Sequence, residues 1–113
     1  PAVDLFMTIS DTEAEEAMRE LAAGRLGDIP VVAGESAVAG FAALKNLLVD
    51  REWKQKAGLT ADSRVLVIST EGATAPRVYE RIVGRSHEAV GLAQREWLEM
   101  RATDASDRKA VSL

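Results

Sequence analysis

The stretch RVLVIST, residues 64–70, is the part of the chain that most strongly indicates a fold class. Its centre is a run of four apolar residues, Val65 to Ile68, and it ends in two hydroxyl residues, Ser69 and Thr70. A continuous apolar run of this length predicts a strand buried on both faces, which is typical of parallel sheets. The strand is expected to deliver its carboxyl end to the loop that follows.

Two further apolar runs lie upstream, and each is followed by residues that favour a helix. Residues 3–9 are mostly apolar and end at Ser10, which with Glu13 three residues later predicts a capping box. Residues 29–34 form a second short apolar run that Gly34 closes. Apolar residues at helical spacing predict helices over about residues 11–23, 37–49, 76–84 and 85–100, followed by a frayed polar end.

The alternation of strand and helix predicts an α/β fold with parallel strands and right-handed helical crossovers. We expect a three-layer α-β-α fragment with a short parallel sheet of about three strands and a C-terminal helix. Residues 1–84 would form the partial α/β domain, and residues 85–113 the C-terminal helix with its frayed tail. Such a small sheet has two open edges, which favour pairing with another chain or with missing parts of the fold.

Composition narrows the class of partner and the type of site. The 113 residues are 47% hydrophobic and 28% charged, which is typical of one globular domain. A net charge of −4 with scattered basic residues argues against nucleic acid. No apolar run is long enough to span a membrane. With no cysteine and one histidine, neither a disulfide nor a metal site is expected, and the cytoplasm is the expected location.

Two loops carry the residue types that bind small anionic or polar ligands. Residues 33–37, AGESA, and residues 68–74, ISTEGAT, each combine glycine, hydroxyl and carboxylate groups at the entry to a helix. In open parallel sheets, ligands bind beyond the carboxyl ends of the strands, where both loops would lie. The hydroxyl residues can equally be helix caps, and the acidic residues solvated loop residues.

At these same loops the sequence resembles a known family. The stretches LFMTISDTEAEEAMRELA (5–22), VVAGESAVAGFAALKNLL (31–48) and RVLVISTEGAT (64–74) resemble the C-terminal part of fold-type II pyridoxal-phosphate enzymes. Within this threonine dehydratase-like superfamily they look most like the diaminopropionate ammonia-lyases, because of VAGES and STEG. The resemblance covers roughly residues 3–84. It implies that residues 1–84 are a partial domain of such an enzyme.

The resemblance also implies an activity and a set of cofactor-binding residues. The activity is α,β-elimination of 2,3-diaminopropionate to pyruvate and ammonia, with pyridoxal phosphate as the electron sink. A strand-end hydroxyl would meet the pyridine nitrogen; Thr70 is the first choice and Ser69 the second, since adjacent strand residues point to opposite faces. Such a neutral partner would leave the nitrogen largely unprotonated. The family loop that lines the cofactor ring is matched by Gly34, Glu35 and Ser36. Gly72 follows the hydroxyl residues as a close-approach glycine.

Two parts of the family's machinery are missing from the sequence. It contains no glycine-rich phosphate loop of the family type, and none of its lysines (Lys45, Lys54, Lys56 and Lys109) lies in the Schiff-base motif. We therefore assign no catalytic residue and expect the chain alone neither to hold the cofactor nor to be active. Its expected partner is a missing N-terminal catalytic part or further copies of itself, and an amino-acid substrate would bind only to a complete enzyme.

Two other functions remain open at this level. The chain could be a non-catalytic α/β module for oligomerisation or binding that kept the family's strand-helix frame. Such a module would associate through its sheet edges and last helix. It could also be an unrelated small α/β protein whose two loops bind a phosphate-bearing ligand. The resemblance leaves open whether the substrate is diaminopropionate, serine or threonine.

Overall fold

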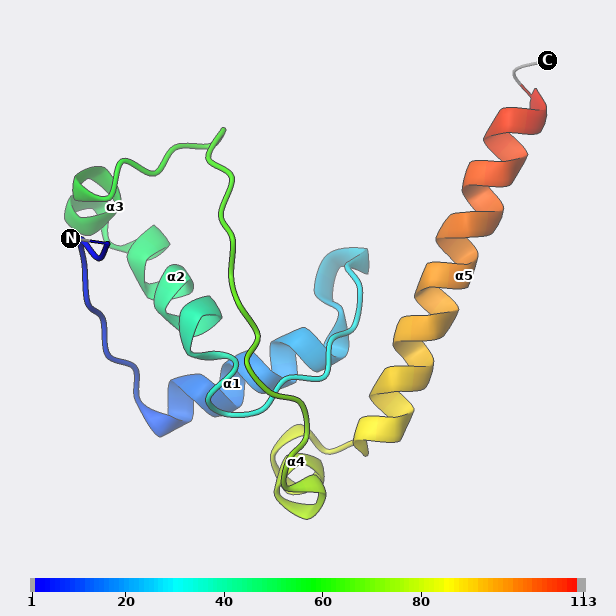
Figure 1. Cartoon of the computed structure of the whole chain (residues 1–113), viewed down its shortest axis with the longest axis horizontal. Coiled ribbons are helices and arrows are strands. Elements are labelled where there is room, and N and C mark those ends of the chain that lie inside the picture. Colours follow the sequence, from blue (N-terminus) through cyan, green and yellow to red (C-terminus); the bar gives the residue numbers. More distant parts are fainter. Residues whose placement is uncertain (1, 112–113) are drawn as a thin grey trace.

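The computed structural model describes residues 2–111, and the regular secondary structure in this part of the chain consists of helices (Figure 1). The elements are α1 (Asp11–Ala23), a 3-10 turn η1 (Arg25–Gly27), α2 (Ala39–Val49), α3 (Arg51–Lys56), α4 (Pro76–Val83) and α5 (His87–Val111). No β-strand occurs among the described residues. The predicted α/β fold with a three-strand parallel sheet is therefore wrong for this structure.

The reason is that none of the three apolar runs has a partner strand; residues 29–34 make only isolated backbone hydrogen bonds, from Val31 to Leu21 and from Gly34 to Glu71. A strand requires a ladder of hydrogen bonds to a neighbour along its length. Neither residues 2–9 nor residues 64–70 make a backbone hydrogen bond to another described segment. Figure 1 shows them on opposite sides of α2, the first in blue and the second in green. The apolar pattern identified segments with the composition of strands, but no segment within residues 2–111 pairs with them.

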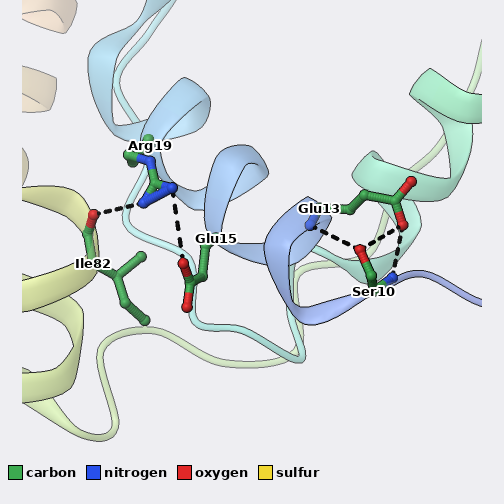
Figure 2. A network of polar contacts seen from close by, with 5 residues as sticks. All are labelled: Ser10, Glu13, Glu15, Arg19 and Ile82. Carbon is green, nitrogen blue, oxygen red and sulfur yellow. Dashed lines mark hydrogen bonds and ion pairs between the residues drawn. The ribbon is translucent and has the colours of Figure 1, made fainter.

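Helix α1 begins and ends where the sequence predicts, because both ends are capped. The Ser10 hydroxyl accepts a hydrogen bond from the Glu13 backbone N–H at 3.2 Å, and the Ser10 backbone N–H donates to the Glu13 carboxylate at 2.7 Å (Figure 2). This is the predicted capping box. At the other end Gly24 adopts the left-handed conformation, with φ of 58°, that closes many helices.

The Glu13 carboxylate also joins α1 to α2. It accepts a hydrogen bond from the Asn46 side-chain amide at 2.7 Å. The backbone N–H of Ser10, the Asn46 amide and the Ser10 hydroxyl, in that order of effect, hold the pKa of Glu13 below its ordinary value. The charged form of this carboxylate therefore stabilises both the start of α1 and its contact with α2.

Small side chains bring α1 close to its neighbours and form most of the core. The predicted apolar face of α1 is confirmed, with Ala14, Ala17, Met18 and Ala22 buried. The remaining buried hydrophobic residues are Ala33, Ala37, Val38, Ala42, Tyr79 and Val90. Figure 2 shows a polar contact at the same junction: Arg19 Nη1 donates to the Ile82 carbonyl oxygen at 3.0 Å and so ties α1 to α4.

One helix was missed by the sequence pattern and another is longer than expected. The polar connector contains α3, whose first turn is capped by the Asp50 carboxylate accepting from the Trp53 backbone N–H at 3.0 Å. Helix α5 continues to Val111 instead of ending near residue 100. It is anchored near its middle, where Trp97 Nε1–H donates to the Gly27 carbonyl oxygen at 2.9 Å.

The arrangement is open. The radius of gyration is 16.8 Å, against about 13 Å for a compact domain of this length. The accessible surface is 8607 Å², against roughly 6,100 Å² for a folded monomer of this mass. Much apolar surface therefore stays in contact with solvent. No helix in residues 2–111 is long and apolar enough to cross a bilayer.

Tyr79 provides a test of the core. Its side chain is only 2% exposed, and its hydroxyl is buried without a hydrogen-bond partner among the described residues. Burial raises the pKa of the phenol, and the positive charge of Arg85 partly offsets this. Since an unpaired buried hydroxyl stabilises nothing, Tyr79→Phe should change the free energy of unfolding by less than about 1 kcal/mol or increase it. Tyr79→Ala should lower it by about 3–5 kcal/mol. Urea unfolding measures both, and a large loss in the phenylalanine variant would contradict this packing.

The capping box gives a prediction about pH. A carboxyl whose pKa is lower in the folded state stabilises the fold above its unfolded-state pKa and loses that effect as the pH falls through the folded value. Glu13→Gln keeps the reciprocal hydrogen bond but loses the charge. The variant should therefore be less stable than the unmodified chain at pH 7, and the difference should shrink as the pH falls below about 4.5. Denaturant unfolding over this range checks it, with Glu99→Gln on exposed α5 as control; a constant difference would show that the charge is not involved.

Candidate functional site

The two loops singled out by sequence lie against each other, and Glu71 joins them. The Gly34 backbone N–H donates to the Glu71 carbonyl oxygen at 3.3 Å, and the Ser36 backbone N–H donates to Glu71 Oε1 at 3.2 Å. The second carboxylate oxygen accepts from the Thr74 hydroxyl at 3.3 Å. One residue therefore holds the turn at residues 33–37 and the turn at residues 69–74. We call this arrangement the Glu71 clamp.

The clamp requires a glycine opposite it. A Cβ added at Gly34 would lie 2.6 Å from the Gly72 carbonyl oxygen and 2.7 Å from Glu71 Oε1, closer than real Cβ contacts. Gly34 is buried, so its neighbours have little room to move. A Cβ added at Gly72, by contrast, would meet nothing within 4 Å. The close approach between the two turns is thus made at Gly34. The close approach of a cofactor at Gly72, which the resemblance implies, stays a prediction.

The predicted cofactor-binding residues fall into two groups in space. Gly34 and its loop neighbours Glu35 and Ser36 lie beside Gly72 across the clamp. Thr70 and Ser69 come directly before the clamp and are exposed to solvent. Ser69 Oγ donates a long hydrogen bond, 3.5 Å, to the Glu71 carbonyl oxygen. The structure thus brings the loops together, while the role of each residue toward a cofactor stays a prediction.

Sequence reasoning gave Glu71 no role beyond that of a possible solvated loop acid. Its environment is different, because both carboxylate oxygens and its carbonyl oxygen accept hydrogen bonds from the two turns. The signal available in the sequence was a carboxylate between a hydroxyl residue and a glycine, at the entry to a helix. That pattern fits many loops, and only the three-dimensional contact with Ser36 identifies the clamp.

The space between the turns is too small for a cofactor the size of pyridoxal phosphate. The hollow there measures about 50 Å³ and is lined by both turns together with residues of α1 and α4, among them Met18 and Tyr79. Pockets for ligands of that size measure about 300 Å³ or more. Lys45 lies elsewhere, on α2, where its ammonium group contacts the Glu20 carboxylate of α1. The described residues around the two turns therefore do not enclose a space of the size that such a cofactor needs.

No metal site takes its place. Within residues 2–111 no group of three or more histidine, cysteine, aspartate or glutamate side chains is placed to hold an ion. A larger groove of about 400 Å³ between α1 and α2 lies away from both turns and is lined by Glu13, Glu16, Lys45, Asn46 and nearby apolar residues. Glu13 and Lys45 are already paired with neighbouring side chains, which leaves Glu16 as the charged residue of this groove without such a pairing among the described residues.

Comparison with known proteins shows that the chain is similar in sequence to part of a lyase. The relative is the diaminopropionate ammonia-lyase of Salmonella typhimurium (strain LT2), which is 41% identical over 87 residues. The match covers 72% of this chain but 22% of the relative, so the chain spans about a fifth of the length of the curated relative it matches. No protein-family model matches the chain, and no solved structure matches it.

The glycine contact is testable by a matched pair of substitutions. Gly34→Ala forces the two turns apart and should lower the free energy of unfolding by about 1–3 kcal/mol, as overpacking typically does. It should also speed hydrogen exchange of the Ser36 amide, because that amide loses its carboxylate partner. Gly72→Ala, which adds the same methyl group in open space, should change neither quantity appreciably. Equal effects of the two substitutions would contradict the clamp geometry.

Proposed function

We propose that this chain is a segment of a pyridoxal-phosphate-dependent ammonia-lyase of fold-type II that acts on 2,3-diaminopropionate. The similarity to the Salmonella enzyme is the observation that carries the proposal, since 41% identity over 87 residues is high for a segment of this length. Supporting it, the two loops with the most distinctive residues, AGES and STEG, are the ones that the Glu71 clamp joins. A structural contact thus coincides with the stretches that resemble the family.

In a complete enzyme the clamped turns would form one wall of the cofactor site. The Thr70 hydroxyl is exposed and has no hydrogen bond in the described part of the chain, so it is free to meet the pyridine nitrogen; Ser69 is the alternative. Gly34, Glu35, Ser36 and Gly72 would lie along the cofactor ring. When bound, pyridoxal phosphate supplies the electron sink for eliminating ammonia from the substrate.

The rest of the machinery would come from elsewhere. The 50 Å³ hollow and the paired state of Lys45 support the view that this chain alone neither binds the cofactor nor catalyses the reaction. The Schiff-base lysine and the phosphate-binding loop would belong to the parts of a lyase outside the matched segment. What this chain contributes is a rigid pair of turns, a hydroxyl group and the small residues that let a planar ring approach.

A chimera tests the proposal. The matched segment of the Salmonella enzyme is replaced by the corresponding residues of this chain, and pyruvate release from 2,3-diaminopropionate is measured together with the absorbance of bound pyridoxal phosphate. We expect the chimera to retain both the cofactor and the activity. A folded chimera that loses the cofactor would overturn the proposal.

Single substitutions in the chimera test the hydroxyl. Thr70→Val should reduce kcat about tenfold or more, because a buried polar contact is worth about 1–3 kcal/mol. Thr70→Ser should restore most of the rate. Thr12→Val, at an exposed threonine of α1, is the matched control and should leave activity unchanged. A loss with Ser69→Ala but not with Thr70→Val would assign the role to the neighbouring hydroxyl.

A further inference from the structure

The Glu71 clamp fixes the position of a second carboxylate residue, Glu35, without using its side chain. The residues on both sides of Glu35 are bound to Glu71. The Gly34 backbone N–H donates to the Glu71 carbonyl oxygen at 3.3 Å, and the Ser36 backbone N–H donates to Glu71 Oε1 at 3.2 Å. The Gly34 carbonyl oxygen also accepts from the Val38 backbone N–H at 3.2 Å, at the start of α2. The backbone around residue 35 is therefore held at several points.

The side chain of Glu35 is free to bind a ligand. It is exposed to solvent and makes no hydrogen bond or ion pair with any described residue. Glu71 differs, because its two carboxylate oxygens already accept hydrogen bonds from Ser36 and Thr74. A charged group that is fixed at its backbone and unpaired at its end loses little freedom when it binds. Glu35 is thus the carboxylate of the clamped turns that can contact a molecule outside them.

The charges around the hollow between the turns are negative. Among the described residues that line it, Glu35 and Glu71 are acidic and none is basic. Tyr79 also lines the hollow, and because burial raises the pKa of its phenol, it adds no charge near neutral pH. Two negative charges without a cation beside them attract cations and repel anions. The charges of the clamp therefore favour a cationic ligand over the phosphate-bearing ligand that its glycine and hydroxyl residues suggest.

The substrates that the sequence leaves open differ in charge at Cβ. Diaminopropionate carries an amino group there, whereas serine and threonine carry a neutral hydroxyl group. Alkyl amines are protonated near neutral pH, so diaminopropionate presents an ammonium group at this position. Hydrogen bonds between ionised groups are roughly twice as strong as those between neutral groups. A free carboxylate beside the cofactor would therefore distinguish these substrates.

We propose that Glu35 selects the substrate by binding the β-ammonium group of a 2,3-diamino acid, in preference to the β-hydroxyl group of serine or threonine. The proposal rests on the proposed function, in which residues 34–36 lie along the cofactor ring. Glu35 acts here as a specificity residue: it binds the group that leaves and takes no proton from the substrate.

The charge on the leaving nitrogen determines which kinetic constant Glu35 affects. Over the whole elimination, the α proton passes to a base of the complete enzyme and the electron pair of the Cα–H bond forms the Cα=Cβ double bond. The Cβ–N bond breaks and its electron pair stays on nitrogen, so a group that enters as ammonium leaves as neutral ammonia. Its attraction to a carboxylate weakens along this path. Because such a contact stabilises the bound substrate more than the transition state, Glu35 should act on KM and much less on kcat.

Two analogues without an α-hydrogen measure the selection in the absence of reaction. They are 2-methyl-2,3-diaminopropionate and 2-methylserine, which differ only in the β-ammonium and β-hydroxyl groups. In calorimetric titrations of the chimera, Glu35→Gln should weaken binding of the diamine analogue about tenfold or more and of 2-methylserine less than about twofold. Glu80→Gln, at an exposed glutamate of α4 outside the hollow, is the matched control and should change neither affinity.

Turnover and hydrogen exchange provide independent measurements. In the chimera, Glu35→Gln should raise KM for 2,3-diaminopropionate about tenfold or more and change kcat less than about threefold. Glu35→Asp keeps the charge and should restore part of the affinity. In the isolated chain, Glu35→Gln should leave hydrogen exchange of the Ser36 amide unchanged, because the Glu35 side chain takes no part in the clamp.

The outcomes separate this proposal from the proposed function. An active chimera in which Glu35→Gln weakens both analogues equally, or neither, overturns the selection and leaves the lyase proposal standing. A chimera that releases no pyruvate but prefers the diamine analogue through Glu35 overturns the lyase proposal and supports the selection. A chimera that binds neither analogue overturns both. Faster exchange of the Ser36 amide in Glu35→Gln would mean that this side chain supports the turn, which also overturns the selection.

Discussion

The contact between Gly34 and Glu71 is the constraint on which the candidate site depends. Two turns far apart in the sequence approach so closely that no side chain fits at position 34, and the carboxylate of Glu71 accepts hydrogen bonds from both. A glutamate carbonyl oxygen accepting from the Gly34 N–H completes the contact. The geometry of the wall proposed for the cofactor is therefore set by a local polar clamp and a missing Cβ, with no sheet required beneath it.

Helices α1 and α4 support this clamp. Helix α1 packs through alanines, which allow close contact with α2 and α4, and Arg19 adds a hydrogen bond to the end of α4. Pro76, in the first turn of α4, follows directly on the clamped loop. Tyr79 and Met18 close the space behind the turns. Movement of α4 relative to α1 would thus pull on the loop that carries Glu71.

Features that depend on residues close together in the sequence could be predicted from it, and features that depend on distant residues could not. The start of α1 was predictable because Ser10 and Glu13 form the capping box within a single turn. The strands were predicted wrongly because residues 64–70 have a strand's composition, while pairing depends on a distant neighbour that the described part of the chain does not place beside them. Helix α3 was missed because its stabilising contacts, the Asp50 cap and a Glu52–Lys56 ion pair, leave no apolar periodicity. The grouping of the AGES and STEG loops was anticipated, but Glu71 as the residue that joins them was not.

The failure of the sheet prediction and the success of the loop grouping have a common physical origin. A parallel strand is stabilised by partners on both edges and by cover on both faces, so removing those partners leaves extended chain with its apolar side chains in water. A hydrogen-bonded carboxylate and a close glycine contact need only the two turns themselves. The chain therefore keeps the geometry that is encoded locally, at residues 34–36 and 71–74, whereas residues 64–70 stay extended and exposed. The boundary between the two falls at Thr70, where the segment without partners meets the clamp.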